Sequence, residues 1–249
     1  MTPVTTHAYN HVEFTELIQA LGSASPRRLR RYRWRARLCP FDRLLESVPI
    51  EASMLDIGCG DGLLLGLLAT RSHRFQGVGL EQSAQRVAQA NAMAESLLGE
   101  ANNARLRFVQ ADVPQDLPPG QFDVVSLIDV LHHVPPKQQS RILAQACAAV
   151  RPGGQLIYKD MCIRPRWRSW ANRLHDLVLS RQWIRYFPVD RVERLANRCG
   201  LALTATARID RYWYGHELRV FVKRASSELP LPARSDRGTS AQAEVATSR

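Results

Sequence analysis

Residues Leu55–Gly62 have the sequence LDIGCGDG, which is the most informative segment of the chain for its fold. It overlaps a short apolar run at 54–57 that is typical of a buried strand, and it precedes LLLGLLA at 63–69, which is typical of a buried helix. Glycines in a strand-to-helix turn permit positive φ angles and let a ligand approach the backbone closely. In open α/β sheets, ligands bind outside the carboxyl ends of the strands. The stretch therefore predicts a ligand-binding loop in the first β-α unit.

Outward from this loop, short apolar runs alternate with helical patterns. The runs predicted to be strands lie at 54–57, 75–80, 106–109, 122–127 and 155–158, and later at 201–209 and 217–222. Helices are predicted from the N-cap Ser83 to about residue 98, over 138–150 and over 189–198, the last ending at Gly200. This alternation predicts an α/β fold: a Rossmann-like, doubly wound, mostly parallel sheet with helices on both faces.

The length of 249 residues suits one domain with extensions. We expect a basic, helical N-terminal arm at 1–48, a ligand-binding domain at 49–224 and a tail at 225–249 whose Ser- and Pro-rich composition predicts disorder. Residues 161–187 are rich in Trp and Arg, and we expect them to form an insertion that covers the carboxyl ends of the strands as a lid.

The sequence also bears on the compartment. It holds no long apolar window, so no transmembrane helix is expected, and its first residues lack the basic and apolar regions of a secretory signal. The five cysteines are scattered without a CxxC pair, which fits neither a disulfide framework nor a zinc site. We therefore expect a cytoplasmic protein, with contact at the inner face of the membrane as a further option.

The net charge of +11 is concentrated in the flanks of the chain. Residues 27–37 alone hold seven arginines, and a second basic stretch with interleaved Trp residues follows at 164–185. Basic residues mixed with aromatic ones suit RNA, an anionic lipid surface or an acidic carrier protein. They also suit an ordinary solvated surface, so the charge alone leaves the partner open.

Charge and spacing narrow the ligand of the glycine loop. A dinucleotide fingerprint would place a third glycine at Leu63, and a phosphate-binding P-loop would end in Gly-Lys-Ser/Thr, which is absent. Asp56 and Asp61 flank the loop, and no Lys or Arg lies between Arg43 and Arg71. A pyrophosphate would meet like charge. Each pair of like unit charges about 4 Å apart costs about 1 kcal/mol in water and about 4 kcal/mol at intermediate dielectric. A ligand with an ammonium group and a sulfonium, S-adenosylmethionine (SAM), would be attracted.

Acidic residues at the ends of the next strands agree with this ligand. Glu81 ends the second strand, where a carboxylate accepts hydrogen bonds from ribose hydroxyls. Asp112 ends the third strand, where it could accept from the adenine amino group. Asp129 follows the fourth strand and would lie below the methionine half.

Taken in order, the segments LDIGCGDG, GVGLEQS, VQADV, FDVVSLIDVLHHV and VRPGGQLI resemble the class I SAM-dependent methyltransferases over residues 50–160. The resemblance implies a seven-stranded sheet with an antiparallel last strand, and SAM as cofactor. The implied cofactor-binding residues are Asp56, Gly58, Cys59, Gly60, Glu81, Gln82, Asp112, Val113 and Asp129. Glu81 departs from the more usual Asp, but its longer side chain should still reach a ribose.

Methyl transfer from a sulfonium is an in-line displacement that mainly needs alignment and exclusion of water. We therefore expect no metal. If the acceptor is a hydroxyl, a general base such as His132, His133 or His175 would contribute about 10²–10⁴-fold. The adjacent histidines could instead be structural, at the start of a helix. Lys159 and Asp160, after the fifth strand, could orient the acceptor or form an exposed ion pair.

The acceptor is the least determined part of the hypothesis. We expect O- or C-methylation of a small-molecule, lipid-like or carrier-linked acceptor, and a weaker resemblance around Trp167 and His175 points to pigment or other secondary metabolism. Residues 129–132 (DVLH) lack the Asn/Asp-Pro-Pro-aromatic motif that is usual for methylation of base amino groups in DNA. The alternatives are an RNA methyltransferase, suggested by the basic flanks, and a non-catalytic SAM-fold binding module.

Overall fold

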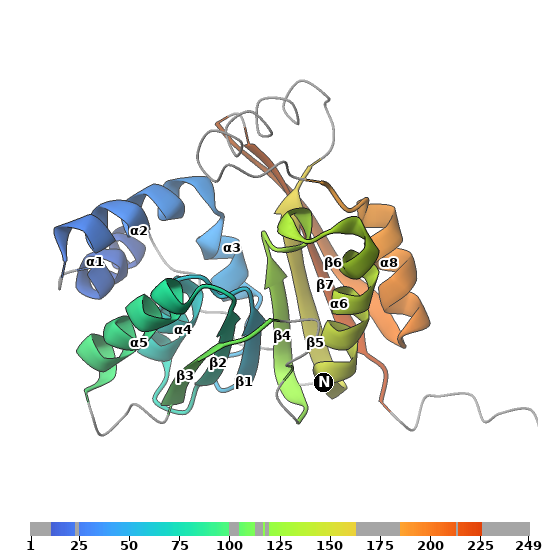
Figure 1. Cartoon of the computed structure of the whole chain (residues 1–249), viewed down its shortest axis with the longest axis horizontal. Helices are drawn as coiled ribbons and strands as arrows, with labels where there is room; N and C mark the ends of the chain where they lie inside the picture. Colours follow the sequence, from blue (N-terminus) through green and yellow to red (C-terminus); the bar gives the residue numbers. More distant parts are fainter. Residues whose placement is uncertain are drawn as a thin grey trace, which may run out of the picture.

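The computed structural model describes residues 11–22, 25–99, 105–112, 117, 120–162, 185–212 and 214–225. The described residues form one seven-stranded sheet in the order β3-β2-β1-β4-β5-β7-β6 (Figure 1). Its strands are β1 (Ser53–Ile57), β2 (Gln76–Glu81), β3 (Leu106–Gln110), β4 (Phe122–Ile128), β5 (Val150–Met161), β6 (Leu201–Arg211) and β7 (Tyr214–Lys223). The first five strands are parallel, whereas β7 is antiparallel to both of its neighbours. The predicted mostly parallel sheet with an antiparallel last strand is confirmed.

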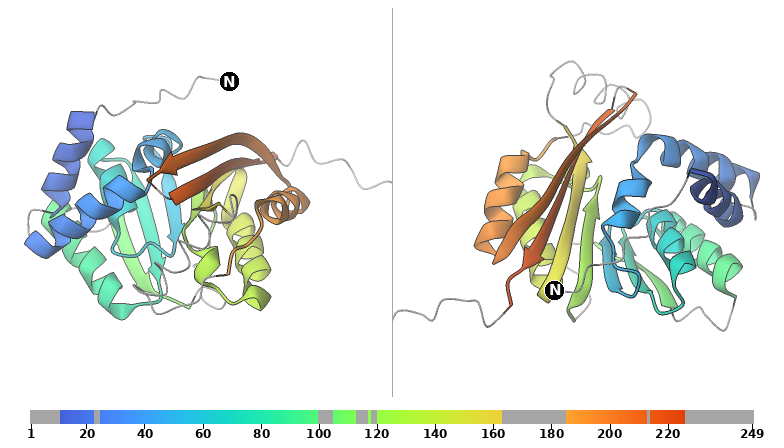
Figure 2. Two further views of the ribbon diagram at one scale, coloured as in Figure 1. Left: turned by 90° about the horizontal axis from the view of Figure 1, so that it is seen from above. Right: turned by 180° about the vertical axis from the view of Figure 1, so that it is seen from behind.

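Helices cover both faces of this sheet (Figures 1 and 2). They are α1 (His11–Gly22), α2 (Pro26–Leu38), α3 (Phe41–Glu46), α4 (Leu63–Arg71), α5 (Ala84–Leu98), α6 (Pro136–Ala149) and α8 (Val189–Arg198), with a 3₁₀ turn, η2, at Leu131–His133. One apolar cluster joins α1–α5 to the sheet, and a second joins α6 and α8 to the opposite face. The predicted doubly wound arrangement is therefore confirmed.

Short sequence signals set the ends of several helices. Ser83 is the N-cap of α5, as predicted, and its Oγ accepts a hydrogen bond from the backbone N of Arg86 at 3.4 Å. Ser25 caps α2 in the same way. After α8, Gly200 takes a φ of +81°, the left-handed conformation that commonly ends a helix.

The start of β5 differs from the prediction. The strand begins at Val150, and the Pro-Gly-Gly run at 152–154 lies inside it instead of before it. Val150 pairs with Phe122, the ladder is then irregular, and regular pairing resumes between Val124 and Gln155. The neighbouring strand thus extends β5 through a sequence that is locally typical of a turn.

Parts of the predicted domain division lie outside the described residues. These parts include residues 1–10 and 23–24 of the arm, residues 163–184 of the expected lid and the tail from residue 226. The arm helices α1–α3 share one apolar cluster with the sheet, and Tyr32 of α2 is fully buried in it. In the described ranges, no helix combines the length and the apolar character that crossing a bilayer requires.

Gly62, which precedes α4, is expected to be intolerant of a side chain. Its φ is +78°, and a Cβ there would lie 2.7 Å from the Phe108 ring and 3.0 Å from Ala90. We expect Gly62→Ala to lower the free energy of unfolding by about 2–4 kcal/mol, which combines left-handed backbone strain with overpacking. Urea denaturation followed by circular dichroism measures the loss.

Gly200→Ala is the matched control for this prediction. Gly200 has a φ of +81°, but a Cβ there would meet nothing within 4 Å. Only the backbone strain, about 1–2 kcal/mol, should appear. Equal losses in the two variants would contradict the proposed clash with Phe108.

Candidate cofactor and acceptor site

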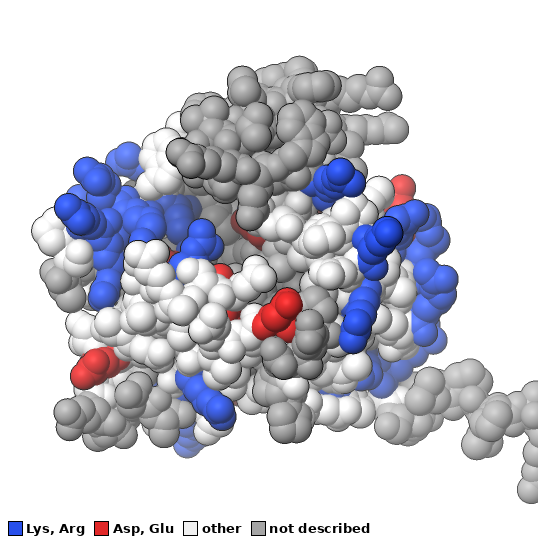
Figure 3. Space-filling model, viewed as in Figure 1, with Lys and Arg blue, Asp and Glu red and all other residues white. Residues whose placement is uncertain are grey.

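The glycine loop joins the carboxyl end of β1 to α4 through three residues with positive φ, Gly58 (+76°), Gly60 (+61°) and Gly62 (+78°). The backbone N of Gly58 donates to Leu80 O at 2.7 Å, which ties the loop to β2. A Cβ at Gly58 would lie only 2.5 Å from Val130 Cγ2, in the segment that follows β4. The loop thus presents bare backbone where the ends of β1, β2 and β4 meet, and Figure 3 shows this view of the molecule hollowed near its centre.

Asp56 lies buried beneath the loop on β1. Its Oδ1 accepts a hydrogen bond from Ser126 Oγ at 2.5 Å. Burial raises the pKa of the Asp56 carboxyl to about 6, because the Ser126 hydrogen bond and the positive charge of Arg35 only partly offset the lost hydration. Asp56, a predicted cofactor residue, is therefore a carboxylate whose ionised form is destabilised by burial at neutral pH.

We expect Asp56→Asn to stabilise the protein in a pH-dependent way. A folded-state pKa of about 6, against an ordinary 3.8, means that the native protein loses stability as pH rises between these values. Asparagine does not titrate, so the variant should gain about 2–3 kcal/mol at about pH 8 and about 1 kcal/mol at about pH 4.5. Urea denaturation at the two pH values measures the difference.

Asp123→Asn provides a control of opposite sign. The pKa of Asp123 is lowered, because hydrogen bonds from Ser53 and Arg151 outweigh its partial burial. This substitution should lower stability at about pH 8, where the carboxylate is ionised. A destabilising effect of Asp56→Asn at that pH would contradict the buried-charge interpretation.

Glu81, at the end of β2, holds the loop as well as facing the site. Its Oε2 accepts from the backbone N of Gly60 at 3.0 Å, and its Oε1 accepts from the backbone N of Ser83 at 2.9 Å. The side chain is buried apart from its edge. One carboxylate therefore connects the glycine loop to the start of α5, and its role toward a ribose stays a prediction.

The remaining predicted cofactor residues lie at the same sheet edge where the structure describes them. Cys59 is buried in the loop, the backbone O of Gln82 accepts from Gln110 Nε2 at 3.3 Å, and Asp112 is exposed just after β3. Val113 lies outside the described residues. The end of β2 is thus joined to the end of β3, with Asp112 next to the junction.

Two arginines that the sequence analysis did not assign to the site come from the arm. Arg31 Nε lies 2.6 Å from Asp61 Oδ2, and Arg35 Nη1 lies 2.7 Å from Asp61 Oδ1. The Tyr32 hydroxyl donates to the backbone O of Asp61 at 3.3 Å. The expectation of a loop with acidic neighbours and no nearby cation is corrected here, because α2 brings these two arginines from 26–30 residues away in sequence. Asp61 is therefore neutralised, and Asp56 and Glu81 remain as the acidic groups.

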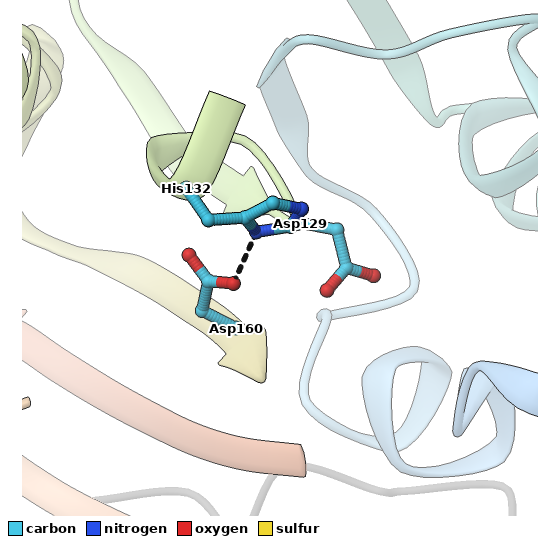
Figure 4. Close-up of side chains that lie close together, drawn as sticks. All are labelled: Asp129, His132 and Asp160. Atoms are coloured by element: carbon cyan, nitrogen blue, oxygen red, sulfur yellow. Dashed lines mark hydrogen bonds and ion pairs between the residues drawn. The ribbon is translucent and has the colours of Figure 1, made fainter. Parts of the chain in front are cut away.

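His132 forms a buried pair with Asp160 (Figure 4). His132 lies in the turn η2 after β4 and Asp160 near the end of β5, and His132 Nδ1 is 2.5 Å from Asp160 Oδ1. The two residues are 2% and 4% exposed. Asp160 also accepts from the Tyr158 hydroxyl at 3.4 Å and from the backbone N of Met161 at 2.8 Å. Such contacts fix the orientation of the imidazole.

The other histidine candidates differ from His132. His133 is an exposed residue whose ring centroid lies 4.1 Å from that of His132. Although the residue as a whole is exposed, its ring is partly covered, and the lost hydration followed by the neighbouring His132 lowers the pKa of His133 to about 4, so it is neutral at pH 7. His175 lies outside the described residues. The structure thus separates two adjacent histidines that are equivalent in sequence.

Asp129 and Lys159 form a second pair beside the first. Lys159 Nζ lies 2.5 Å from Asp129 Oδ2, and the Lys159 side chain is fully buried. Burial alone would raise the pKa of Asp129, but Lys159, His216 and His132 together outweigh it and lower the pKa to about 2. Asp129 has a φ of +56°, which is rare for a residue other than glycine. Lys159 and Asp160 are therefore not the exposed ion pair that the sequence analysis considered.

The two pairs together contain a set of metal-type donors. One donor atom from each of Asp129, His132 and Asp160 lies within 4.8 Å of the others. Asp129 already binds the Lys159 ammonium, and Asp160 already accepts from His132. Two of the three donor residues thus already have an internal partner.

A family model described as a methyltransferase domain matches residues 26–206, from the arm to β6. The chain belongs to the class I SAM-dependent methyltransferases. The match includes the glycine loop, Glu81 and both the His132–Asp160 and Lys159–Asp129 pairs, so each described element of the site falls within the family domain.

Curated relatives of this methyltransferase include O-methyltransferases. It is 30% identical over 137 residues to the ubiquinone biosynthesis O-methyltransferase of Albidiferax ferrireducens, covering 55% of this chain and 48% of the relative. It is 31% identical over 109 residues to the protein of the same name from Idiomarina loihiensis, covering 43% and 42%. The methyltransferase thus spans about half the length of these relatives.

Solved structures show the same fold at low identity. An O-methyltransferase family protein from Burkholderia thailandensis gives a TM-score of 0.63 at 18% identity, covering 88% of this chain and 64% of that chain. Magnesium protoporphyrin IX methyltransferase from Synechocystis PCC 6803 with bound SAH gives 0.60 at 17%, covering 87% and 89%. The [4+2]-cyclase SpnF gives 0.58 at 17%, covering 75% and 81%. These likenesses establish the fold of the methyltransferase and leave its acceptor open.

Proposed function

We propose that this methyltransferase transfers a methyl group from SAM to a hydroxyl oxygen of a small-molecule acceptor. The observation that carries the proposal is the His132–Asp160 pair, buried at the ends of β4 and β5 on the same sheet edge as the glycine loop. A base oriented in this way suits an acceptor that must lose a proton. The relatives named ubiquinone biosynthesis O-methyltransferases support oxygen as the acceptor atom.

The residues of the loop fit the cofactor, which supplies a methyl group bound to a positively charged sulfur. Gly58 and Gly60 offer backbone that no Cβ obstructs. Glu81 would accept from the ribose hydroxyls and Asp112 from the adenine amino group. Arg35, whose guanidinium would lie 3.3 Å from a Cβ at Gly60, would meet the methionine carboxylate. The other proposed cofactor contacts are Asp56, Cys59, Gln82, Val113 and Asp129.

The proposed mechanism gives the two members of the buried pair separate tasks. Asp160 accepts the Nδ1–H of His132 and so selects the tautomer in which Nε2 carries the lone pair. When the acceptor hydroxyl receives the methyl group that SAM would supply, His132 would take the hydroxyl proton on Nε2. Asp160 then stabilises the resulting imidazolium, as carboxylates do in other histidine-based sites.

Methyl-labelled SAM and a fractionated cell extract test this function. Label in an organic-soluble small molecule, with the methyl group on oxygen, would support the proposal. Label in RNA would support the alternative drawn from the basic flanks. A SAM-fold module that does not methylate is the second candidate, because SpnF, a cyclase, has a similar fold. Calorimetric binding of SAM without transfer to any fraction would favour that candidate.

Removing metal ions is expected to leave the rate of methyl transfer unchanged. Lys159 supplies the cation that pairs with Asp129, and Asp160 is engaged by His132, so the donor set has no need of a divalent ion. Dialysis against EDTA followed by a rate measurement, with and without added Mg²⁺ or Zn²⁺, tests this. A rate that collapses and is restored by one of these ions would contradict the assignment of Lys159.

A further inference from the structure

Helix α2 has two faces with different surroundings. At the edge of the helix nearest the glycine loop, Arg31 and Arg35 pair with Asp61. Four other residues, spaced three or four apart and therefore on one side of the helix, are exposed: Arg27, Arg30, Trp34 and Arg37. We call these four residues the outer row. The side chain of Trp34 is a large hydrophobic group that stays 46% exposed.

The outer row carries charge that nothing nearby balances. Helix α2 holds seven arginines and no acidic residue, and two of the seven neutralise Asp61. Within the described part of the chain, no carboxylate pairs with an arginine of the outer row. Figure 3 shows Lys and Arg side chains gathered over α1 and α2. The outer row is therefore suited to an anionic partner.

A comparison with α8 shows that the outer row differs from an ordinary basic surface. Helix α8 also carries three arginines, but Asp190 and Glu193 lie on the same helix, and Glu193 pairs with Arg219. It displays no large hydrophobic side chain among the described exposed residues. The combination of unbalanced arginines with an exposed indole is specific to α2 in the described chain.

We propose that the outer row docks on an anionic phospholipid bilayer. Guanidinium groups bind phosphate oxygens, and Trp favours the boundary between headgroups and acyl chains, where its ring is half apolar and half polar. RNA is less suited to this face, since single strands are held in grooves lined by several stacking aromatics, and this helix offers one on a convex surface. The partner is therefore a lipid surface.

Docking would place the acceptor site beside the bilayer. Because α2 contacts the glycine loop through Asp61, the helix borders the sheet edge that holds both buried pairs (Figure 1). An apolar acceptor could then pass from the bilayer to the site without crossing bulk water, a role that rests on the proposed function. Docking itself needs no methyl transfer.

Vesicle sedimentation with the full chain tests the proposal. Vesicles of equal parts phosphatidylcholine and phosphatidylglycerol should bind the protein at low ionic strength, and phosphatidylcholine alone should not. Binding should fade in about 0.5 M NaCl, which screens surface charge within a few ångströms. The triple variant Arg27→Gln/Arg30→Gln/Arg37→Gln should lower the partition coefficient roughly a hundredfold, since each arginine near an anionic surface contributes about fivefold.

The control variant Arg141→Gln/Arg194→Gln/Arg198→Gln removes the same charge from exposed positions on α6 and α8, and it should keep most of the binding. Both variants should bind SAM as the unmodified protein does, which separates docking from the proposed function. Equal losses in the two variants, equal binding to neutral vesicles, or RNA that outcompetes the vesicles through the outer row would each overturn the proposal.

Discussion

Replacing His132 with asparagine is expected to lower kcat by about 10²–10⁴-fold, the usual contribution of a general base. Asparagine is similar in size and can still hydrogen-bond to Asp160, but it cannot take a proton at neutral pH. The dissociation constant for SAM should stay close to that of the unmodified protein, because His132 is not among the proposed cofactor contacts. Steady-state kinetics with the acceptor identified by labelling, together with calorimetry of SAM, measures both quantities.

His133→Asn is the matched control, one residue away. His133 is exposed, and no described contact ties its ring to a carboxylate as Asp160 ties His132. Its substitution should leave most of the rate intact. If His133→Asn lowered kcat as strongly as His132→Asn, or if His132→Asn acted only on KM, the assignment of the base would be wrong.

Replacing Glu81 with alanine is expected to weaken SAM binding roughly tenfold to a hundredfold. The substitution removes hydrogen bonds to a charged group, which contribute about 1.5–3 kcal/mol. It also releases the backbone N of Gly60, which the carboxylate holds at 3.0 Å. Isothermal titration calorimetry with SAM measures the change.

Two controls separate binding from folding in this experiment. Glu81→Gln keeps an oxygen acceptor for Gly60 and should fall between the alanine variant and the unmodified protein. Glu51→Ala removes an exposed carboxylate that pairs with Arg74 on the surface, and it should not alter SAM binding. If Glu81→Ala folds normally and its dissociation constant for SAM is unchanged, Glu81 does not bind the ribose.

The order of the elements was predictable because local patterns specify it. The apolar runs, the cap Ser83 and the glycine after α8 each act over a few residues, and the structure places helix and strand ends close to them. The start of β5 was not predictable in this way. Val150 is strand because Phe122 of β4 lies alongside it, and this partner overrides the local turn tendency of the glycines at 153–154.

The residues of the site also fall into those that local sequence patterns predict and those that depend on distant partners. Glu81 and the loop glycines could be found from sequence, because each lies at the end of a strand in the first two β-α units. The pairs of Arg35 with Asp61 and of His132 with Asp160 join residues 26 and 28 positions apart on different elements. No local sequence pattern predicts these two pairs. The spacing of Arg31 and Arg35, one helical turn apart, was the available signal, and it needed a known partner to become informative.

Lys159 and Asp129 have a consequence for how this enzyme can be re-engineered. The fully buried Lys159 ammonium would be left as an uncompensated charge if Asp129 were lost, at a cost of about 3–5 kcal/mol, whereas exchanging both for neutral side chains of similar volume is often tolerated. These two positions therefore behave as one locus. A mutant library that randomises either position alone would mostly yield destabilised variants, so the two positions are best varied jointly.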